Sequence, residues 1–357
     1  MLFCDAHGVQ PSFDPQFGRI IRYDVPLLEG YTHRFLRNVA PHPGLSSLGL
    51  VNPAVLRLLM TAEFDAIVVH GYSYVTSLLA LLGPRRRTRV LLRGESHLLP
   101  RRSPAKELGK QLVLRALFRR IDHFLPIGSL NHEYYASYGV RPERMTLAPY
   151  SVDNGLFASG SAEARRDPSA VRRGLGLPER IPLFLFSAKL IAKKRPFDAL
   201  RAFARVRERV PCGLVYVGDG ELAADLDREI PGLGMGGDVH RLGFRNQSEL
   251  PAVYGACDAL LLPSDCEPWG LVVNEAMACG MAVIVSDHVG AGPDLAEPEC
   301  IHRVGDLEQL STIMLRLAAD PGELERAKAR ASARIRRWGL DETADGFLRG
   351  VNAALVA

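Results

Sequence analysis

The stretch that decides the fold comprises residues 263–285 and reads PSDCEPWGLVVNEAMACGMAVIV. A short apolar run with the length of a strand precedes it at 259–262, and a second closes it at 282–285. The residues between the two runs are typical of a loop followed by a helix, as in a βαβ unit. Pro268 is tolerated only before that helix or in its first turn. We therefore predict a helix that begins near Gly270.

The start of this helix predicts an anion site. The amides of Gly270, Leu271 and Val272 have no partner within the helix and lie at its positive end. Two carboxylates, Glu267 and Glu275, flank the site with seven residues between them. They cannot neutralise a phosphate, but they suit the ribose and hexose hydroxyls of a nucleotide sugar whose diphosphate takes the amides. The alternative is a helix whose first turn is merely well charged.

The run Glu267-Pro-Trp-Gly-Leu followed by Asn274-Glu275-Ala-Met-Ala-Cys-Gly closely resembles the donor-site signature of the retaining family 4 glycosyltransferases of the GT-B fold. The resemblance covers nearly all of the chain and is strongest from 181 to 295. It implies an α/β protein of two facing Rossmann-like domains. It also implies metal-independent transfer of a hexosyl or pentosyl group, with retention, from a nucleoside-diphosphate sugar such as a UDP- or GDP-sugar to an acceptor hydroxyl, without a cofactor. The products would belong to glycan, glycolipid or natural-product biosynthesis.

Two lysines five residues apart, Lys189 and Lys194, follow the first expected strand of the second half. Cations at such a strand end can neutralise a leaving diphosphate, although lysine clusters are usually solvated. The resemblance implies that both bind the donor phosphates and that Lys194 and Glu267 are catalytic. It places Phe244 and Arg245 beside the nucleobase.

Three further patterns each allow a functional and a structural interpretation. The turn at 217–221 is glycine-rich, and it is interpreted either as purely structural or as a close approach to the donor. The run at 232–237 fits G-x-G-x-x-G, but it follows a helix-like stretch, whereas the dinucleotide fingerprint follows a strand. Asp225 and Asp227 form an Asp-x-Asp on a helix surface, which we interpret as solvated charge and not as a metal site.

The loop after the strand near residue 93 contains the remaining catalytic candidate, His97. Many family members have a histidine beside the donor sugar in this loop, but alignment of 93–97 puts Gly94 nearest to that position. Glu95, Ser96 and His97 therefore all stay candidates, and a structural role for His97 is the alternative.

Length and composition indicate two globular domains. The chain has 357 residues with 47% hydrophobic and 24% charged content. We predict domains at 1–160 and 161–338, joined by a linker at 158–176 that is rich in Ala, Ser, Gly and charged residues. We also predict a final helix at 339–357 that packs back on the first domain. Family members open with an additional strand, loop and helix, which we do not find here. Residues from Asp14 to Asn38 resemble a segment of some members, after their second strand.

The six cysteines show no metal-ligand spacing and are expected to be reduced and buried. No apolar run approaches the ~20 residues that cross a bilayer, and no export signal is present. We expect a cytoplasmic protein that binds no nucleic acid.

Charge is distributed unevenly. Residues 1–150 carry 19 Lys and Arg against 11 Asp and Glu, a net charge of +8, whereas the remainder carries 25 against 29. The segment 106–120 mixes Leu108, Leu112, Leu117 and Phe118 with basic residues, as an interfacial helix would. We therefore expect an anionic or lipid-linked acceptor, met peripherally at the inner membrane; the alternative is that these apolar residues pack on the sheet.

Two other function classes remain open at this stage. A nucleotide-sugar-binding or scaffold protein without catalysis is motivated by the absent strand and helix. A nucleotide-sugar epimerase is less favoured, because its site needs further acid-base carboxylates that we cannot place.

Overall fold

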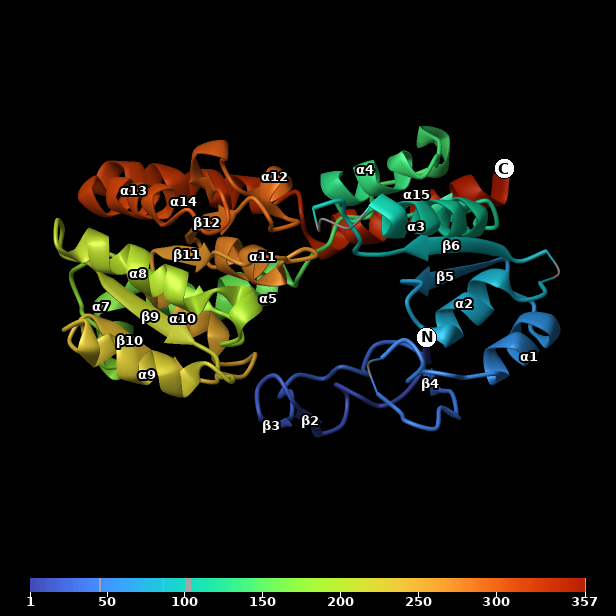
Figure 1. Cartoon of the computed structure of the whole chain (residues 1–357), viewed down its shortest axis with the longest axis horizontal. Coiled ribbons are helices and arrows are strands. Elements are labelled where there is room, and N and C mark those ends of the chain that lie inside the picture. The colour runs from blue at the N-terminus through green and yellow to red at the C-terminus, as the bar shows by residue number, and fades with distance from the viewer. Residues whose placement is uncertain (45, 86, 100–103, 357) are drawn as a thin grey trace. The chain divides into compact units, whose positions relative to one another are not determined.

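The apolar runs of the second half form strands that are buried on both faces in the computed structural model (Figure 1), which describes residues 1–44, 46–85, 87–99 and 104–356. Four strands are buried throughout: β8 (Leu183–Ser187), β9 (Gly213–Val217), β11 (Ala259–Leu262) and β12 (Ala282–Ser286). Continuous apolar strands of this kind are typical of parallel sheets covered by helices on both faces.

The sheet has six parallel strands in the order β10-β9-β8-β11-β12-β13, with β10 at Val239–Gly243 and β13 at Ile301–His302. Numbered within this half, the order is 3-2-1-4-5-6, that of a Rossmann fold. The strand order reverses between β8 and β11. Ligands of such sheets bind at the carboxyl ends of the strands beside this reversal. The prediction of a Rossmann-like second domain is confirmed.

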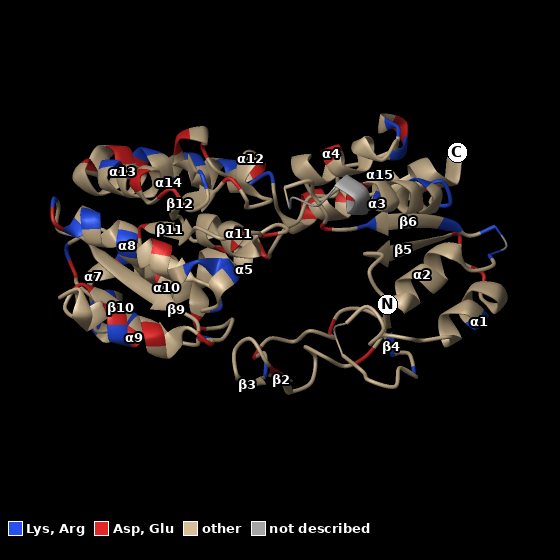
Figure 2. Ribbon diagram, in the orientation of Figure 1, with Lys and Arg blue, Asp and Glu red and all other residues tan. Residues whose placement is uncertain are grey.

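Seven helices connect or follow these strands: α8 (Pro196–Arg207), α9 (Ala223–Gly232), α10 (Leu250–Ala256), α11 (Leu271–Ala278), α12 (Gly292–Leu295), α13 (Leu307–Ala319) and α14 (Pro321–Ile335). Alternate strand residues such as Phe184 and Tyr216 form one core with apolar residues of α8, α9 and α13. The outer surfaces of these helices carry residues of both charge signs (Figure 2).

The first half contains two small parallel sheets. One pairs β1 (Leu2–Phe3) with β4 (Arg34–Phe35), and the other has the order β5 (Ala66–His70), β6 (Arg89–Arg93) and β7 (His123–Phe124). The helices are α1 (Ala54–Thr61), α2 (Val75–Leu82), α3 (Pro104–Phe118), α4 (Ser129–Ser137) and α15 (Leu340–Val356). The described residues 4–33 form no helix. No helix in the described part of the chain has the length and apolar content to cross a membrane.

The chain divides into two units whose boundaries differ from the predicted ones. The first unit contains residues 1–11, 26–150 and 341–356, and the second contains residues 12–25 and 151–340. The predicted boundary near residue 160 is therefore ten residues too late. The segment 12–25, expected in the first domain, forms the hairpin β2 (Ser12–Asp14) and β3 (Arg19–Ile21) of the second unit.

The predicted linker is wrong, because its residues form three short helices: α5 (Asn154–Gly160), α6 (Ala162–Arg166) and α7 (Pro168–Gly174). The small residues that suggest a linker serve close packing on α10. A Cβ on Gly160 would lie 2.8 Å from Pro251 Cβ, and one on Gly255 would lie 2.9 Å from Ala164 Cβ.

The interfacial prediction for 106–120 is wrong for two of its four apolar residues, Leu117 and Phe118. Leu117 and Phe118 are 6% and 2% exposed and belong to the core of the first unit, because α3 packs there on β6 and α4. Leu108 and Leu112 are exposed. In the basic run before α3, Arg85 and Arg89 pair with Asp122. Arg86, Arg101, Arg102 and the side chain of Lys106 lie outside the described residues.

Arg172 on α7 is a buried structural cation. It donates to the carbonyls of Ala256 (2.7 Å) and Ile181 (2.9 Å) and to the carboxylate of Asp258 (2.8 Å). Because Arg172→Met leaves these acceptors short of a donor, we expect it to lower the free energy of unfolding by ~3–5 kcal/mol. Arg173→Met, which changes an exposed neighbour, should lower the free energy of unfolding far less. Urea denaturation of both variants measures the difference, and equal stabilities would contradict the assignment.

Candidate donor-binding site

A pocket of about 180 Å³ lies at the carboxyl ends of β8, β9 and β10, beside the reversal of strand order. Its lining residues all belong to the second unit. They include five of the predicted donor-site residues: Lys189, Phe244, Arg245, Val272 and Glu275. The sequence prediction and the topology therefore indicate the same place.

Lys189 enters the pocket from the loop after β8. A Cβ on Gly218, whose φ is +126°, would lie 2.0 Å from the carbonyl oxygen of Ala188. Glycine at 218 thus lets the loop after β9 pass closely behind Lys189, and Gly218 itself lines the pocket. Both interpretations of the glycine-rich turn, structural and ligand-side, are compatible with this geometry.

Glu275 lies within a chain of buried hydrogen bonds. Its Oε2 accepts from the Tyr254 hydroxyl (2.8 Å), and Ser187 Oγ lies 3.0 Å from the same hydroxyl. Burial raises the pKa of Glu275 above its ordinary value, and the hydrogen bond from Tyr254 offsets this only in part. The carboxylate is therefore an acceptor held in place but poorly solvated, which suits a ligand hydroxyl.

A raised pKa means that the folded protein binds the Glu275 proton more tightly than the unfolded chain, so this group's contribution to stability decreases as pH rises through the folded pKa. We therefore expect Glu275→Gln to stabilise the protein near neutral pH by ~0.5–2 kcal/mol. The gain should disappear as the pH is lowered and the wild-type carboxyl takes up its proton. Donor binding should weaken by ~1–3 kcal/mol, as it should in Glu275→Ala.

Thermal denaturation of Glu275→Gln across a pH series tests this expectation, with Glu221→Gln at an exposed site as the control. A Glu275→Gln protein less stable than wild type at neutral pH would contradict the account of a poorly solvated carboxylate.

Helix α11 begins where the sequence predicts. Gly270 caps it with φ +96°, a conformation that favours glycine, and among the described residues no side chain caps the first turn. The amides of Gly270, Leu271 and Val272 therefore point out of the helix start. Val272 and Glu275 bring this helix to the pocket wall.

Lys194 and Glu267 form an ion pair with each other, and neither is among the residues that line the pocket. Their side chains are 18% and 13% exposed. Lys194 ends a short 3-10 turn (Ala192–Lys194), and Glu267 follows β11. The backbone of Glu267 is fixed to the loop after β12, since its amide donates to His288 and its carbonyl accepts from Gly290.

The other signature residues have structural roles. The ring of Trp269 is buried and stacks on Trp338 with centroids 5.2 Å apart. Its Nε1 donates to Asn274 Oδ1 (2.8 Å), which ties the loop to the first turn of α11. These contacts hold the segment between Glu267 and Glu275 in a fixed conformation.

His97 belongs to the first unit and does not line this pocket. It is buried in the loop after β6, and its Nδ1 accepts from the amide of Leu99 (3.3 Å). Next to it, Glu95 accepts from the Tyr150 hydroxyl (2.5 Å), and the Ser96 carbonyl accepts from Asn131 (2.7 Å). These bonds give the loop defined local contacts within the first unit.

The remaining motifs lie away from the pocket. The run 232–237 follows α9 and precedes β10, the reverse of the order in a dinucleotide fingerprint. Asp225 and Asp227 pair with Arg228 and Arg241. The described residues hold no cluster of His, Cys, Asp or Glu suited to a metal ion. All six cysteines are free thiols, four of them buried.

The sequence did not identify ten of the lining residues as site residues, and four of these bring an aromatic ring or a hydroxyl group to the pocket: Phe17, Tyr23, Ser187 and Tyr254. Ser187 is the last residue of β8, a position that topology alone marks as ligand-side. Phe17 carried a signal, since it lies in the segment that resembles some family members, but that segment was expected in the other domain.

Two protein-family models match the chain. "Glycosyl transferase 4-like domain" matches residues 3–151, and "Glycosyl transferases group 1" matches residues 169–334. D-inositol 3-phosphate glycosyltransferase of Rhodococcus jostii is 28% identical over 265 residues, which are 71% of this chain and 56% of that protein. The enzyme of the same name from Salinispora arenicola is 33% identical over 159 residues, 42% of this chain and 36% of that protein. The matched stretches thus span about half the length of the first of these relatives and about a third of the second.

Solved structures show the same fold. Anabaena Alr3699/HepE in complex with UDP superposes with a TM-score of 0.70 at 21% identity, covering 90% of this chain and 86% of that chain. Sucrose-phosphate synthase from Thermosynechococcus elongatus has a TM-score of 0.67 at 20% identity, covering 93% and 87%. The fold is therefore GT-B, and with both family models matched in sequence order, the chain belongs to the family 4 glycosyltransferases.

Proposed function

We propose that the protein transfers a hexosyl or pentosyl group from a nucleoside-diphosphate sugar to an acceptor hydroxyl, with retention of anomeric configuration. The observation that carries the proposal is the pocket at the carboxyl ends of β8 to β10, where Lys189, Glu275 and the start of α11 converge. A cation, a hydroxyl acceptor and free helix amides are the groups that a nucleoside diphosphate requires. The UDP bound to Alr3699/HepE supports this class of donor.

Each residue has a distinct role in the proposal. Phe244 and Arg245 lie beside the nucleobase and Glu275 binds the ribose hydroxyls. Lys189, Lys194 and the amides of 270–272 hold the diphosphate, while Glu267 binds the sugar hydroxyls. In the structure each lysine is paired with a carboxylate, Lys189 with Asp14 and Lys194 with Glu267. The donor phosphates compete with these carboxylates for the two ammonium groups.

Catalysis rests on stabilising the negative charge of the departing diphosphate. Fixed cations and helix amides do this in place of a metal ion, because they are oriented before the charge develops. For retention, the departing phosphate accepts the proton of the acceptor hydroxyl on the same face of the sugar. No protein acid-base residue is required at that step.

Thermal-shift screening against UDP, GDP, ADP and their sugars, followed by hydrolysis assays on the hits, tests the function. We expect one nucleoside diphosphate and its sugar to raise Tm, and the sugar nucleotide to be cleaved slowly by water. Binding without turnover, with varied acceptors present, would support the non-catalytic alternative. The absence of any stabilising nucleotide would overturn the proposal.

For the acceptor we propose an anionic or lipid-linked molecule, met at the inner surface of a membrane. Three apolar side chains of α3 support this, since Leu108, Leu112 and Val113 are 61%, 67% and 66% exposed. Arg115 lies on the same helix and Arg119 directly after its end, and both are also exposed. An exposed apolar and basic helix face is the kind of surface that binds anionic lipid.

Co-sedimentation with vesicles at low salt measures this contact. We expect the protein to pellet with anionic vesicles and less with neutral ones, each basic residue contributing ~1 kcal/mol. Leu112→Glu should reduce pelleting, whereas Leu348→Glu, at a similarly exposed position on α15, should not. Pelleting that is equally absent from both vesicle types would contradict the membrane proposal.

A further inference from the structure

The hairpin β2–β3 comes from the beginning of the sequence but is part of the second unit. It brings two aromatic side chains, Phe17 and Tyr23, to the wall of the donor pocket. The other lining residues come from positions 187–275, so the hairpin supplies a wall that the Rossmann sheet and its helices lack.

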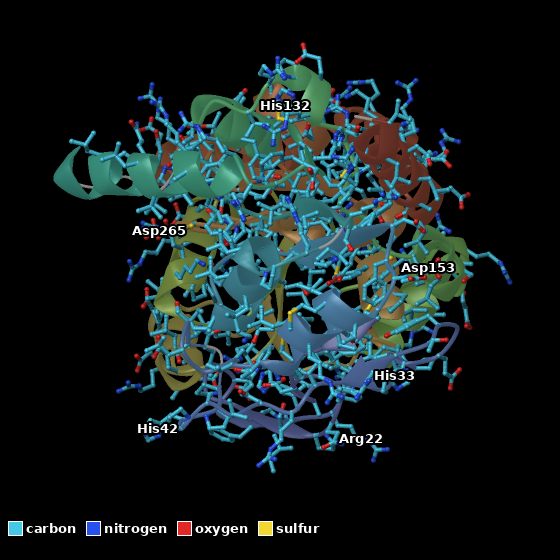
Figure 3. The ribbon with its side chains drawn as sticks, turned by 90° about the vertical axis from the view of Figure 1, so that its right-hand side faces the viewer. Arg22, His33, His42, His132, Asp153 and Asp265 are labelled. Atoms are coloured by element: carbon cyan, nitrogen blue, oxygen red, sulfur yellow. The ribbon has the colours of Figure 1, made fainter. Side chains whose placement is uncertain are left out.

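The hairpin is attached to two loops at the carboxyl edge of the sheet. At its tip, Asp14 Oδ2 and Gln16 Oε1 accept from Lys189 Nζ at 2.8 and 2.9 Å. At its far end, the carbonyl of Arg22 accepts from Asn246 Nδ2 (2.7 Å). The side chain of Arg22 is exposed (Figure 3), so here the backbone, not the guanidinium, makes the attachment.

A second carboxylate strengthens the far attachment. Asp24 accepts from both the amide and the hydroxyl of Ser248. The hairpin is thus fixed to the loop after β8 and to the loop after β10, on both sides of β9.

The tip holds Phe17 in a defined place. Asp14 Oδ1 accepts from the amides of Gln16 (2.9 Å) and Phe17 (3.1 Å), which fixes the turn. The ring of Phe17 meets Phe244 edge to face, with centroids 5.3 Å apart at 86°. Lys189 Nζ lies 4.7 Å from the Phe17 centroid, on the phosphate side of the proposed site.

The ionisation of Asp14 supports this arrangement. Burial alone would raise its pKa, but the hydrogen bonds from Lys189 and from the Phe17 and Gln16 amides outweigh burial and lower it. Asp14 is therefore ionised at neutral pH, and its contacts with the tip and with Lys189 persist there.

The contacts of the hairpin define which end of the pocket it covers. Three of them, with Phe244, Asn246 and Ser248, fall on the loop after β10, and the fourth, with Lys189, falls on the loop after β8. Glu275 and Val272 lie on α11, which follows β11. The hairpin therefore covers the side of the pocket that extends from Lys189 to the residues assigned to the nucleobase, and none of these four contacts falls on α11.

We propose that Phe17 and Tyr23 are binding residues that pack against the nucleobase of the donor beside Phe244. This inference rests on the proposed function, because it requires a nucleoside diphosphate in the pocket. Aromatic rings suit the task, since every base has an apolar face on which they can pack. Because its own hydrogen bonds already order the tip, the tip should lose little conformational entropy when the nucleotide binds.

Isothermal titration with UDP, GDP and ADP tests the proposal, using the nucleotide that wild type binds most tightly. We expect Phe17→Ala and Tyr23→Ala each to weaken binding about tenfold, the scale for loss of one base–aromatic contact. Phe17→Leu keeps apolar volume but not the ring, so its affinity for the nucleotide should lie between those of wild type and Phe17→Ala. Phe13→Ala is the matched control: Phe13 lies on the same hairpin, is 59% exposed and does not line the pocket, so its affinity should stay within about twofold of wild type.

Repeating the titrations in a Lys189→Met background separates base contact from support of Lys189. If Phe17→Ala lowers the nucleotide affinity by the same factor in this background as in wild type, the result supports base contact. If it no longer lowers the affinity, Phe17 acts through Lys189, and the proposal is overturned. If wild type binds a nucleotide and both Phe17→Ala and Tyr23→Ala bind it with the same affinity, this inference is overturned while the proposed function stands. If wild type binds none of the three nucleotides, the proposed function fails first.

Discussion

Replacing Lys194 by Met is expected to lower kcat by about two to three orders of magnitude, the scale for loss of one preorganised group that stabilises transition-state charge. Lys194 is largely buried, ends the 3-10 turn after β8 and pairs with Glu267, so it is fixed beside the start of α11. The affinity for the free nucleoside diphosphate should fall less than kcat, because negative charge accumulates on the leaving phosphate only as the glycosidic bond breaks.

Lys193→Met provides the matched control, since Lys193 is the exposed neighbour in the same turn. Initial rates of nucleoside diphosphate release measure both variants, and Lys194→Arg shows whether charge alone suffices. If Lys194→Met and Lys193→Met retain the same activity, Lys194 has no part in catalysis.

Glu267→Gln is expected to lower kcat/KM for the nucleotide sugar about 10- to 100-fold, the equivalent of one charge-assisted hydrogen bond to a sugar hydroxyl. The backbone contacts of Glu267 with His288 and Gly290 do not depend on its side chain, so the loop should persist. Affinity for the nucleoside diphosphate without sugar should stay the same or rise, because Lys194 loses a competing carboxylate.

The control for this variant is Asp265→Asn, which removes an exposed carboxylate two residues away that pairs with Arg195. Comparing titrations of the free nucleotide with rates on the sugar nucleotide separates the two roles. Parallel losses in both measurements would assign Glu267 to phosphate or nucleoside binding and refute its contact with the sugar.

The local sequence pattern of apolar runs, glycines and prolines was sufficient to predict the second Rossmann-like unit. Strand β11 has the predicted bounds because Ala259–Leu262 is a continuous apolar run with no helical alternative of that length. The helix after it begins beside Gly270, whose positive φ and position after Pro268 are local requirements. Lys189 and Phe244 were identified because each follows a strand end at a position that the family resemblance marks, and Glu275 because it belongs to the donor-site signature.

Features that depend on distant packing were not predictable from the sequence. The hairpin at 12–25 joins the second unit through Arg22 and Asn246, which are 224 residues apart, and no local pattern encodes such a contact. The composition at 158–176 indicated a linker, because glycine and alanine serve flexible segments and close helix packing equally well. Leu117 and Phe118 could not be separated from Leu108 and Leu112 by periodicity alone, although the first pair is buried and the second exposed.

We expect the donor diphosphate to bind at the carboxyl ends of β8 and β11. A crystal structure of the protein with the nucleoside diphosphate selected by the thermal-shift screen tests it most directly. We expect the phosphates to lie at Lys189, Lys194 and the amides of 270–272, the ribose to lie on Glu275, and the base to lie between Phe244 and the hairpin. Phosphates bound at the glycine-rich loop 232–237, or in the first unit, would contradict this expectation.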